Sequence, residues 1–141
     1  MVAVDNLLKL LTDADTELDS LWEIVDEACA VIKSKCLRDG KLDAELLDAW
    51  QLVSYELAFC VADISAAKAF NRYALQLGQS EITNQISLSF SAEIIQAVLQ
   101  RLISRSVDVG MDRNRLLDFY ARPTVNLLLD TYLSSDSLAG I

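Results

Sequence analysis

Apolar residues recur in steps of three and four along most of the chain, which is the spacing of an α-helix with one apolar side. The clearest example is residues 43–77, a segment without glycine or proline. Its apolar stripe comprises Leu46, Leu47, Trp50, Val53, Leu57, Val61 and Ile64. A helix of this length would extend about 50 Å. We therefore expect one continuous helix here, with Asp43 as its N-cap, and expect the other segments to pack along it.

Two helices are predicted before this segment. Residues 2–11 have the pattern of a short amphipathic helix. The acids between Asp13 and Asp19 then resemble the start of a new helix, because negative charge is favourable at a helix N-terminus. Basic residues near its end, followed by Gly40, complete that pattern. The prediction is a short N-terminal helix followed by a long one.

Capping residues and one proline mark the helix boundaries in the second half of the chain. Ser80 and Asp112 are predicted N-caps, and Gly110 is predicted to end the helix that Ser80 begins. Pro123 disfavours helical geometry in the residue before it and is favourable at the first position of a helix. We therefore expect the last helix to break there and to restart over residues 124–133, with a frayed tail after it.

These elements together predict an all-α protein. The expected architecture is an up-down bundle of about four main helices, with a short N-terminal helix and a proline-broken last helix. No alternation typical of strands is evident. A length of 141 residues is typical of one domain, so residues 1–141 are expected to form a single helical-bundle domain.

Composition narrows the classes of function. Apolar residues make up 52% of the chain, which is high for a soluble bundle and predicts an apolar face covered by a second copy or a partner subunit. A net charge of −9 disfavours nucleic-acid binding, because phosphates would be repelled. No run of 18 apolar residues lacks a charge and no targeting signal is evident, so we expect no membrane span and a cytoplasmic location.

The chain contains no histidine, which removes the commonest general base and metal ligand. Ser-His and Cys-His nucleophile systems are therefore absent, and no metal site is expected. The three cysteines, Cys29, Cys36 and Cys60, form no Cys-x-x-Cys motif and are interpreted as small buried apolar residues. A local basic region is interpreted as a solvated face rather than an anion site; it comprises Arg101, Arg105, Arg113 and Arg115.

Four charged residues lie inside apolar runs: Glu56, Asp63, Lys68 and Glu93. One hypothesis is that a carboxylate with a raised pKa acts there as a general acid or base. A two-metal carboxylate site would need the Glu-x-x-His motif of such bundles, which a chain without histidine cannot supply. We favour the simpler interpretation, in which Asp63 or Glu93 forms an ion pair between helices with a basic residue such as Lys68, Arg72 or Arg101, or flanks the core in solvent.

The serines after the second helix boundary leave two alternatives open. Ser87, Ser89 and Ser91 follow one another at every second position. They would either allow two helices to approach closely or face water.

Several short stretches of the chain resemble segments of a known protein family. They are residues 56–58, 63–70, 88–95, 101–105 and 107–110, read as ELA, DISAAKAF, LSFSAEII, RLISR and VDVG. This arrangement is similar to the C-terminal helical domain of acyl-CoA dehydrogenases, which has a long helix with an Ala-Ala-Lys stretch and a return helix with an Ala-Glu centre. In that family, flavin and acyl chain lie between this bundle, a middle β-domain and an N-terminal helical domain.

The chain also departs from that family. Only Gly78 stands where the family has a glycine pair that helps to hold a neighbouring subunit's flavin, and residues 118–123 do not resemble the stretch with the catalytic glutamate. We therefore assign no catalytic, cofactor-binding or metal residue. The resemblance implies an assembly or accessory module of a flavin-dependent oxidoreductase, inactive as an isolated chain, with FAD bound only together with partner domains. The alternatives are a helical protein–protein interaction module and a module that binds a small apolar ligand.

Overall fold

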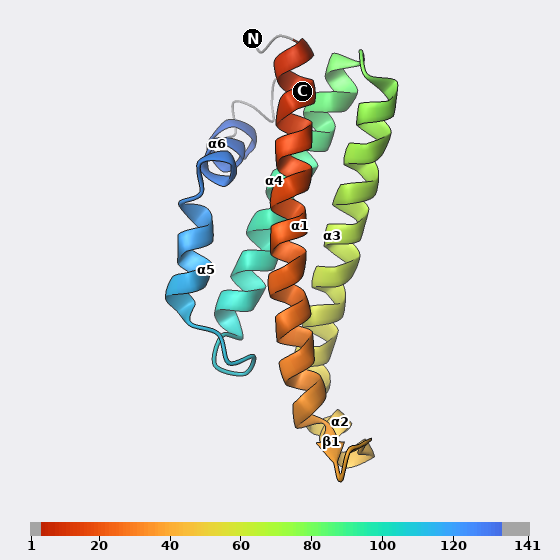
Figure 1. The fold of residues 1–141 in the computed structure, drawn as a ribbon, viewed down its shortest axis with the longest axis vertical. Helices are drawn as coiled ribbons and strands as arrows, with labels where there is room; N and C mark the ends of the chain where they lie inside the picture. Colours follow the sequence, from red (N-terminus) through yellow and green to blue (C-terminus); the bar gives the residue numbers. More distant parts are fainter. Residues whose placement is uncertain (1–3, 134–141) are drawn as a thin grey trace.

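The computed structural model describes residues 4–133 as a helical bundle with one small hairpin (Figure 1). Its elements are α1 (Val4–Lys35), β1 (Leu37–Arg38), β2 (Lys41–Leu42), α2 (Ala44–Ala49), α3 (Gln51–Leu77), α4 (Glu81–Ser104), α5 (Arg113–Tyr120) and α6 (Pro123–Tyr132). The predicted all-α bundle is confirmed: α1, α3 and α4 are its long helices, and α5 followed by α6 occupies the fourth position. The predicted tail lies outside the described residues.

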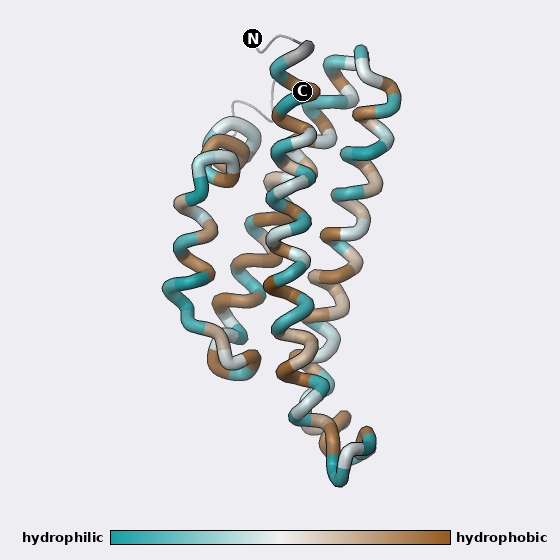
Figure 2. The backbone as a smooth tube through the Cα atoms, in the orientation of Figure 1, coloured by the Kyte–Doolittle hydropathy of each residue, from teal (hydrophilic) through white to brown (hydrophobic). Residues whose placement is uncertain are grey.

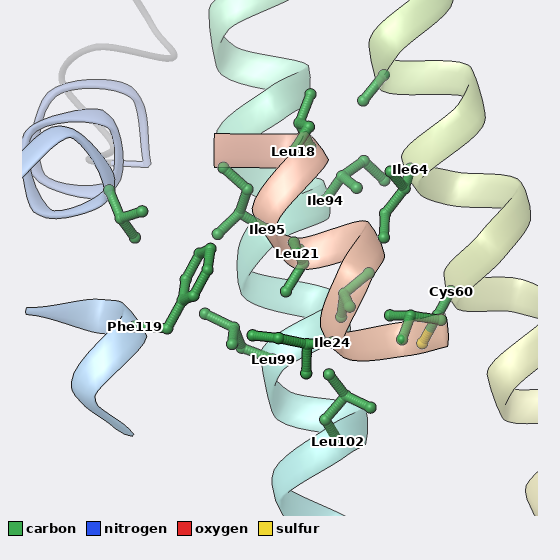
Figure 3. Close-up of a cluster of buried hydrophobic side chains, with 14 of the residues drawn as sticks. Leu18, Leu21, Ile24, Cys60, Ile64, Ile94, Ile95, Leu99, Leu102 and Phe119 are labelled. Carbon is green, nitrogen blue, oxygen red and sulfur yellow. The ribbon is translucent and has the colours of Figure 1, made fainter. Parts of the chain in front are cut away.

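Helices α1 and α4 form the central pair of the bundle. Helix α3 packs against both from one side, whereas α6 packs against the same two helices from the other side (Figure 1). Helix α3 is therefore an edge helix. The expectation that the other segments pack along residues 43–77 is confirmed for α1 and α4 but is wrong for α6, which packs on the other side of that pair. The core between the helices contains side chains from α1, α3, α4, α5 and α6. Figure 3 shows Leu18, Leu21, Ile24, Cys60, Ile64, Ile94, Ile95, Leu99, Leu102 and Phe119.

The predicted short N-terminal helix is wrong, because residues 4–35 form one helix of 32 residues. The buried stripe runs through it without a break and comprises Leu7, Leu11, Ala14, Leu18, Leu21, Val25, Ala28 and Ile32. The acids after Asp13 flank this stripe and do not begin a new helix. Their charge is tolerated inside the helix because most of it faces solvent or a cation.

The predicted continuous helix over residues 43–77 is also wrong. Asp43 is an N-cap, as predicted, and its carboxylate accepts from the Leu46 N–H at 3.1 Å, but it caps only the short helix α2. The break lies at Trp50, with φ −104° and ψ 14°. Its carbonyl accepts both the N–H and the hydroxyl of Ser54, at 2.9 and 2.8 Å. The same bond back to the preceding turn occurs three times inside α1 without a break, so the hydroxyl is not the cause. Helix α2 contains no buried residue, so no covered apolar stripe holds it in line with α3.

A two-stranded hairpin joins α1 to α2, although no strand was predicted. Leu37 pairs with Leu42, and Arg38 pairs with Lys41. Asp39 and Gly40 have positive φ values of 51° and 77°, as a two-residue type I′ hairpin loop requires. The Asp-Gly pair is a strong hairpin signal, but strands of two residues are too short to show alternation.

The helix boundaries in the second half follow the predicted signals. The Ser80 hydroxyl accepts from the Thr83 N–H, the Asp112 carboxylate accepts from the Asn114 N–H, and Pro123 is the first residue of α6. One boundary differs, because α4 ends at Ser104 and successive turns lead from there to Gly110.

Candidate functional site

The charged residues predicted inside apolar runs form ion pairs between helices. Glu56 of α3 accepts two hydrogen bonds from Arg105 of α4, from Nε at 2.7 Å and from Nη2 at 3.1 Å. Asp63 accepts from Arg101 Nη1 at 2.7 Å, a pair that was among those predicted. Hydrogen bonding to Arg105 holds the pKa of Glu56 below its usual range. The hypothesis of a raised carboxylate pKa is therefore wrong for Glu56.

Lys68 and Glu93 complete this picture. Lys68 is ion-paired across the α1–α3 contact with Asp19, and with Asp15 at 3.6 Å, rather than with Asp63 or Glu93. Glu93 lies exposed on α4. The interpretation as helix-joining ion pairs, with a solvated carboxylate in the case of Glu93, is confirmed.

The local basic region is largely matched with acids. Arg115 of α5 donates to both carboxylate oxygens of Glu27 on α1, at 2.6 and 3.0 Å, and Arg105 lies 3.7 Å from Asp108. The Arg115–Glu27 pair joins α5 to α1, whereas the Arg105–Asp108 pair is local to the turn after α4.

The cysteines behave as packed apolar groups. All three thiols are free; Cys36 and Cys60 are buried and Cys29 is half-buried. Burial raises the pKa of both Cys29 and Cys60, and Arg101 only partly offsets it at Cys60. Thiols of raised pKa stay protonated at neutral pH and are poor nucleophiles. Within residues 4–133, no three His, Cys, Asp or Glu side chains gather closely enough to hold a metal ion.

A buried polar cluster joins α3 to α4. The Asn71 side-chain oxygen accepts from the hydroxyls of Ser87 and of Ser91, the latter at 3.1 Å, and all three residues are fully buried. Ser89 is buried as well. The serines therefore lie inside the bundle and do not face water. Sequence reasoning missed Asn71, although its spacing from Ala67 and Ala74 places it on the inner stripe.

An apolar groove lies where the hairpin and α2 meet α1 and α3. It has a volume of about 300 Å³, and its walls include Cys29, Ile32, Leu42, Leu47, Leu57 and Val61. Leu42 and Leu47 are 61% and 41% exposed, so apolar surface stays open to solvent at this end of the bundle.

Among the described elements, α3 has the most exposed large apolar side chains. We call this exposed side of the helix the α3 outer face and define it as Leu52, Tyr55, Phe59, Ala62, Ala66, Phe70, Tyr73 and Leu77. Its five large side chains other than Phe70 are between 47% and 61% exposed, and Phe70 is half-buried. Figure 2 shows hydrophobic residues along the whole length of this edge helix.

The α3 outer face carries no charge. Helix α3 has only four charged residues, and the two acids, Glu56 and Asp63, pair with α4. Lys68 pairs with α1, and Arg72 lines a groove beside it with Asp19. Helix α3 thus has two apolar sides, and an apolar side of a helix is normally covered. Sequence reasoning followed the inner stripe alone, although the steps of three and four from Leu52 to Ala66 were equally readable.

Residues of α4 extend this surface. Phe90 packs edge-on against Phe70, with ring centroids 6.3 Å apart, and Ile82 and Ile86 are 59% and 42% exposed. On the same flank, the Arg101 guanidinium lies 5.7 Å from the Phe59 ring centroid. The charge-free strip on α3 thus has an apolar border at one end and a cationic border nearer its middle.

Helix α4 is the one helix in the described part of the chain that is long and apolar enough to cross a membrane by length and composition. More than half of its apolar window, 56%, is buried inside the bundle, as in the core helix of a soluble protein. The expectation of no membrane span and a cytoplasmic location therefore stays a prediction.

Comparison with protein-family models finds no match for this chain, and no curated protein matches it. The resemblance to the acyl-CoA dehydrogenase bundle therefore stays a prediction from the residues that carry it.

Proposed function

We propose that this protein is an assembly module, a helical bundle that binds another protein surface through the α3 outer face. The observation that carries this proposal is the unbroken, charge-free apolar strip along one exposed side of α3. Monomeric proteins rarely leave so long a strip of large apolar side chains in water. Covering five such side chains, each about half exposed, would contribute on the order of 5 kcal/mol before the entropic cost of association.

The rest of the molecule supports an assembly role over catalysis. The ionisable groups between the helices are matched in ion pairs, and burial raises the pKa of the Cys29 and Cys60 thiols. These arrangements stabilise a scaffold. A catalytic group would instead be expected in a cleft, with its charge poised for transfer.

The test compares two variants with the same chemical change. Phe59→Glu places a charge in the α3 outer face, whereas Leu117→Glu places one at a comparably exposed apolar residue of α5. Tagged chains are isolated under native conditions from cells that naturally make the protein, and the mass of each complex is measured. We expect the unsubstituted chain and Leu117→Glu to run above the 15.6 kDa chain mass and Phe59→Glu to run as a monomer. Equal masses for the two variants would contradict the proposal.

The resemblance to acyl-CoA dehydrogenases gives the assembly a more specific form. If the partner is a flavin-dependent oxidoreductase, the isolated complex should have a flavin absorption spectrum, and Phe59→Glu should lose the spectrum together with the partner. A colourless complex would leave the assembly role and remove the oxidoreductase connection.

A second candidate function is binding of a small apolar ligand, and the groove beside α2 is the observation that favours it. Apolar walls from α1, α3 and the hairpin would cover a short acyl or aromatic group. Organic extraction and mass spectrometry of the native protein test this candidate. A bound molecule that Leu57→Trp excludes would support it; identical extracts from both proteins would contradict it.

A further inference from the structure

We infer that the occupant of the α3 outer face is a second copy of the same chain, packed with α3 antiparallel to α3 about a two-fold axis. The inference rests on the proposed function and adds the identity and the direction of the partner. It comes from the order of the residues along the outer face, which reads the same from both ends.

Read from the N-terminal end, the outer face presents Leu52, Tyr55, Phe59 and Ala62. Read from the C-terminal end, it presents Leu77, Tyr73, Phe70 and Ala66. Both readings give leucine, tyrosine, phenylalanine and alanine in the same order. The midpoint of every pair falls close to position 64.

A two-fold axis would pair the two halves of this order with each other, so that each residue meets one of the same type. Contacts in such an interface are reciprocal: if position i of one copy contacts position j of the other, then position j of the first copy contacts position i of the other. With α3 antiparallel to its copy and the axis at the level of Ile64, Tyr55 would meet Tyr73 of the other copy. Leu52 would meet Leu77, and Ala62 would meet Ala66, in each case of the other copy.

The direction of the side chains agrees with this pairing. An α-helix has 3.6 residues per turn, so residues 18 positions apart project in the same direction after five turns. Tyr55 and Tyr73 are 18 positions apart. Leu52 and Leu77 are 25 apart and Phe59 and Phe70 are 11 apart, which are about seven and three turns. A two-fold axis perpendicular to the helix keeps each side of one copy facing the same side of the other. The paired rows therefore meet, and neither is displaced to the opposite flank.

The sizes of the side chains also fit. The alanines lie in the middle of the face and the large side chains lie toward its ends. Two helices with small residues at the crossing point can approach closely, and the large residues then close over the diverging ends. The α3 outer face has no charge at the crossing point. The Asp63–Arg101 ion pair lies beside it, where each charge already has its partner within the chain.

The area available suits a stable dimer. Helix α3 has 27 residues and is about 40 Å long. A strip of that length needs a width of about 20 Å to bury about 800 Å² per copy, the usual size of a specific interface. One helix supplies roughly half of that width. The exposed Ile86 and half-buried Phe90 on the α4 flank, with Trp22 on the α1 flank, lie where the other half is needed.

The first test is the mass of the purified recombinant chain alone, followed by cysteine cross-linking. We expect twice the 15.6 kDa chain mass. In an antiparallel pair, position 55 lies next to position 73 of the other copy but roughly 27 Å from its own copy. Under mild oxidation, a mixture of Tyr55→Cys and Tyr73→Cys chains should therefore form linked dimers, while each variant alone should not. The unsubstituted chain, with its own three cysteines, is the blank.

Linked dimers from Tyr55→Cys alone would overturn the antiparallel arrangement, because they would place position 55 beside its own copy. A monomer at high concentration would overturn pairing with a second copy altogether. That result would leave the proposed function to its own test, in which the complex is isolated from cells and a different partner can still be present.

A second variant covers the case in which removing a tyrosine weakens the dimer. Ala66→Phe makes the face more apolar but places a large ring where the two helices cross. A close antiparallel seam should weaken, with at least a tenfold increase in the dissociation constant. A dissociation constant that stays the same or falls would show nonspecific association of apolar surface. It would overturn the close antiparallel packing of α3 against α3.

Discussion

The two long sides of α3 have nearly the same apolar character but different surroundings. On the inner side, Leu57 and Ile64 are 5% and 0% exposed, because α1 and α4 cover them. On the outer side, Tyr55 and Phe59 are 57% and 59% exposed. Hydrophobicity alone does not distinguish the two sides. A helix with two apolar sides thus indicates two sets of contacts, one within the chain and, as we propose, one between chains.

The comparison has a second part, because the inner side is the one that contains a buried amide. The Asn71 side-chain oxygen accepts from Ser87 and Ser91 of α4, whereas its amide nitrogen is buried with no hydrogen-bond partner among the described residues. The outer face offers no such partners and carries only apolar residues and tyrosines. The buried amide oxygen of Asn71 therefore lies where α4 holds its two hydroxyl donors in place.

The largest expected effect comes from deleting a side chain on the inner side of α3, and the matched deletion on the outer side should have a small effect. Ile64→Ala should lower the free energy of unfolding by about 2–5 kcal/mol, because it opens a cavity in the core. Phe59→Ala should lower it by less than about 1 kcal/mol in the monomer, because its ring is already largely in water. Urea denaturation at a protein concentration low enough to give a monomer measures both losses. Equal losses would contradict the distinction between the sides.

A smaller loss is expected at the buried amide. Asn71→Ala should cost roughly 1–3 kcal/mol of unfolding free energy, because it leaves two buried hydroxyls without their acceptor. Ser89→Ala is the matched control: the Ser89 hydroxyl is buried with no hydrogen-bond partner among the described residues, so its removal should be neutral or stabilising. A larger loss from Ser89→Ala than from Asn71→Ala would refute this assignment.

Trp50 marks the point where the inner stripe leaves the core. Its ring is half-buried, with Lys35 Nζ 4.5 Å from the centroid. Trp50→Ala should therefore cost about 1–2 kcal/mol, less than the 3–5 typical of a buried tryptophan. Thermal unfolding followed by circular dichroism tests this. A loss typical of full burial would show that α2 packs more tightly than the exposure of its residues indicates.

The smallest effect concerns the ion pair beside the outer face. Arg105 holds the pKa of Glu56 below its usual range, so this pair stabilises the fold fully above the ordinary glutamate pKa of about 4.3. The contribution is lost as the pH falls from there through the lowered pKa of the folded state. Unfolding at several pH values from 7 to 3 should show a shallower acid loss for Glu56→Gln. Arg105→Gln should give the same shallower loss, and an unchanged slope in either variant would rule out this pair as the source.

Local signals predicted the parts of the fold that depend on neighbouring residues. Ser80, Asp112 and Pro123 begin helices because a side-chain oxygen or a fixed φ acts within one turn. The continuity of α1 and the break at Trp50 were not predicted. Both depend on whether an apolar stripe stays covered by other helices, and acids or serines beside the stripe do not indicate this.

The candidate residues divide in the same way. The sequence showed that charges inside apolar runs need partners, and it indicated Arg101 for Asp63. It did not show that Glu56 would meet Arg105 or that Lys68 would meet Asp19. Those pairs depend on how far α3 is shifted along its axis relative to α4 and α1. The spacing of the apolar residues of the α3 outer face was visible in the sequence. Their exposure to solvent was not, because it depends on which side of α3 the other helices cover.

By itself, then, the sequence determined the helical class, most of the helix ends in the second half, and the excess of apolar residues, because these follow from spacing, capping and composition. Only the tertiary structure decided that α1 and α4 occupy the centre and that α3 lies at the edge. The reason is physical: periodicity tells which sides of a helix avoid water, but only packing against particular neighbours decides which of those sides the chain itself covers.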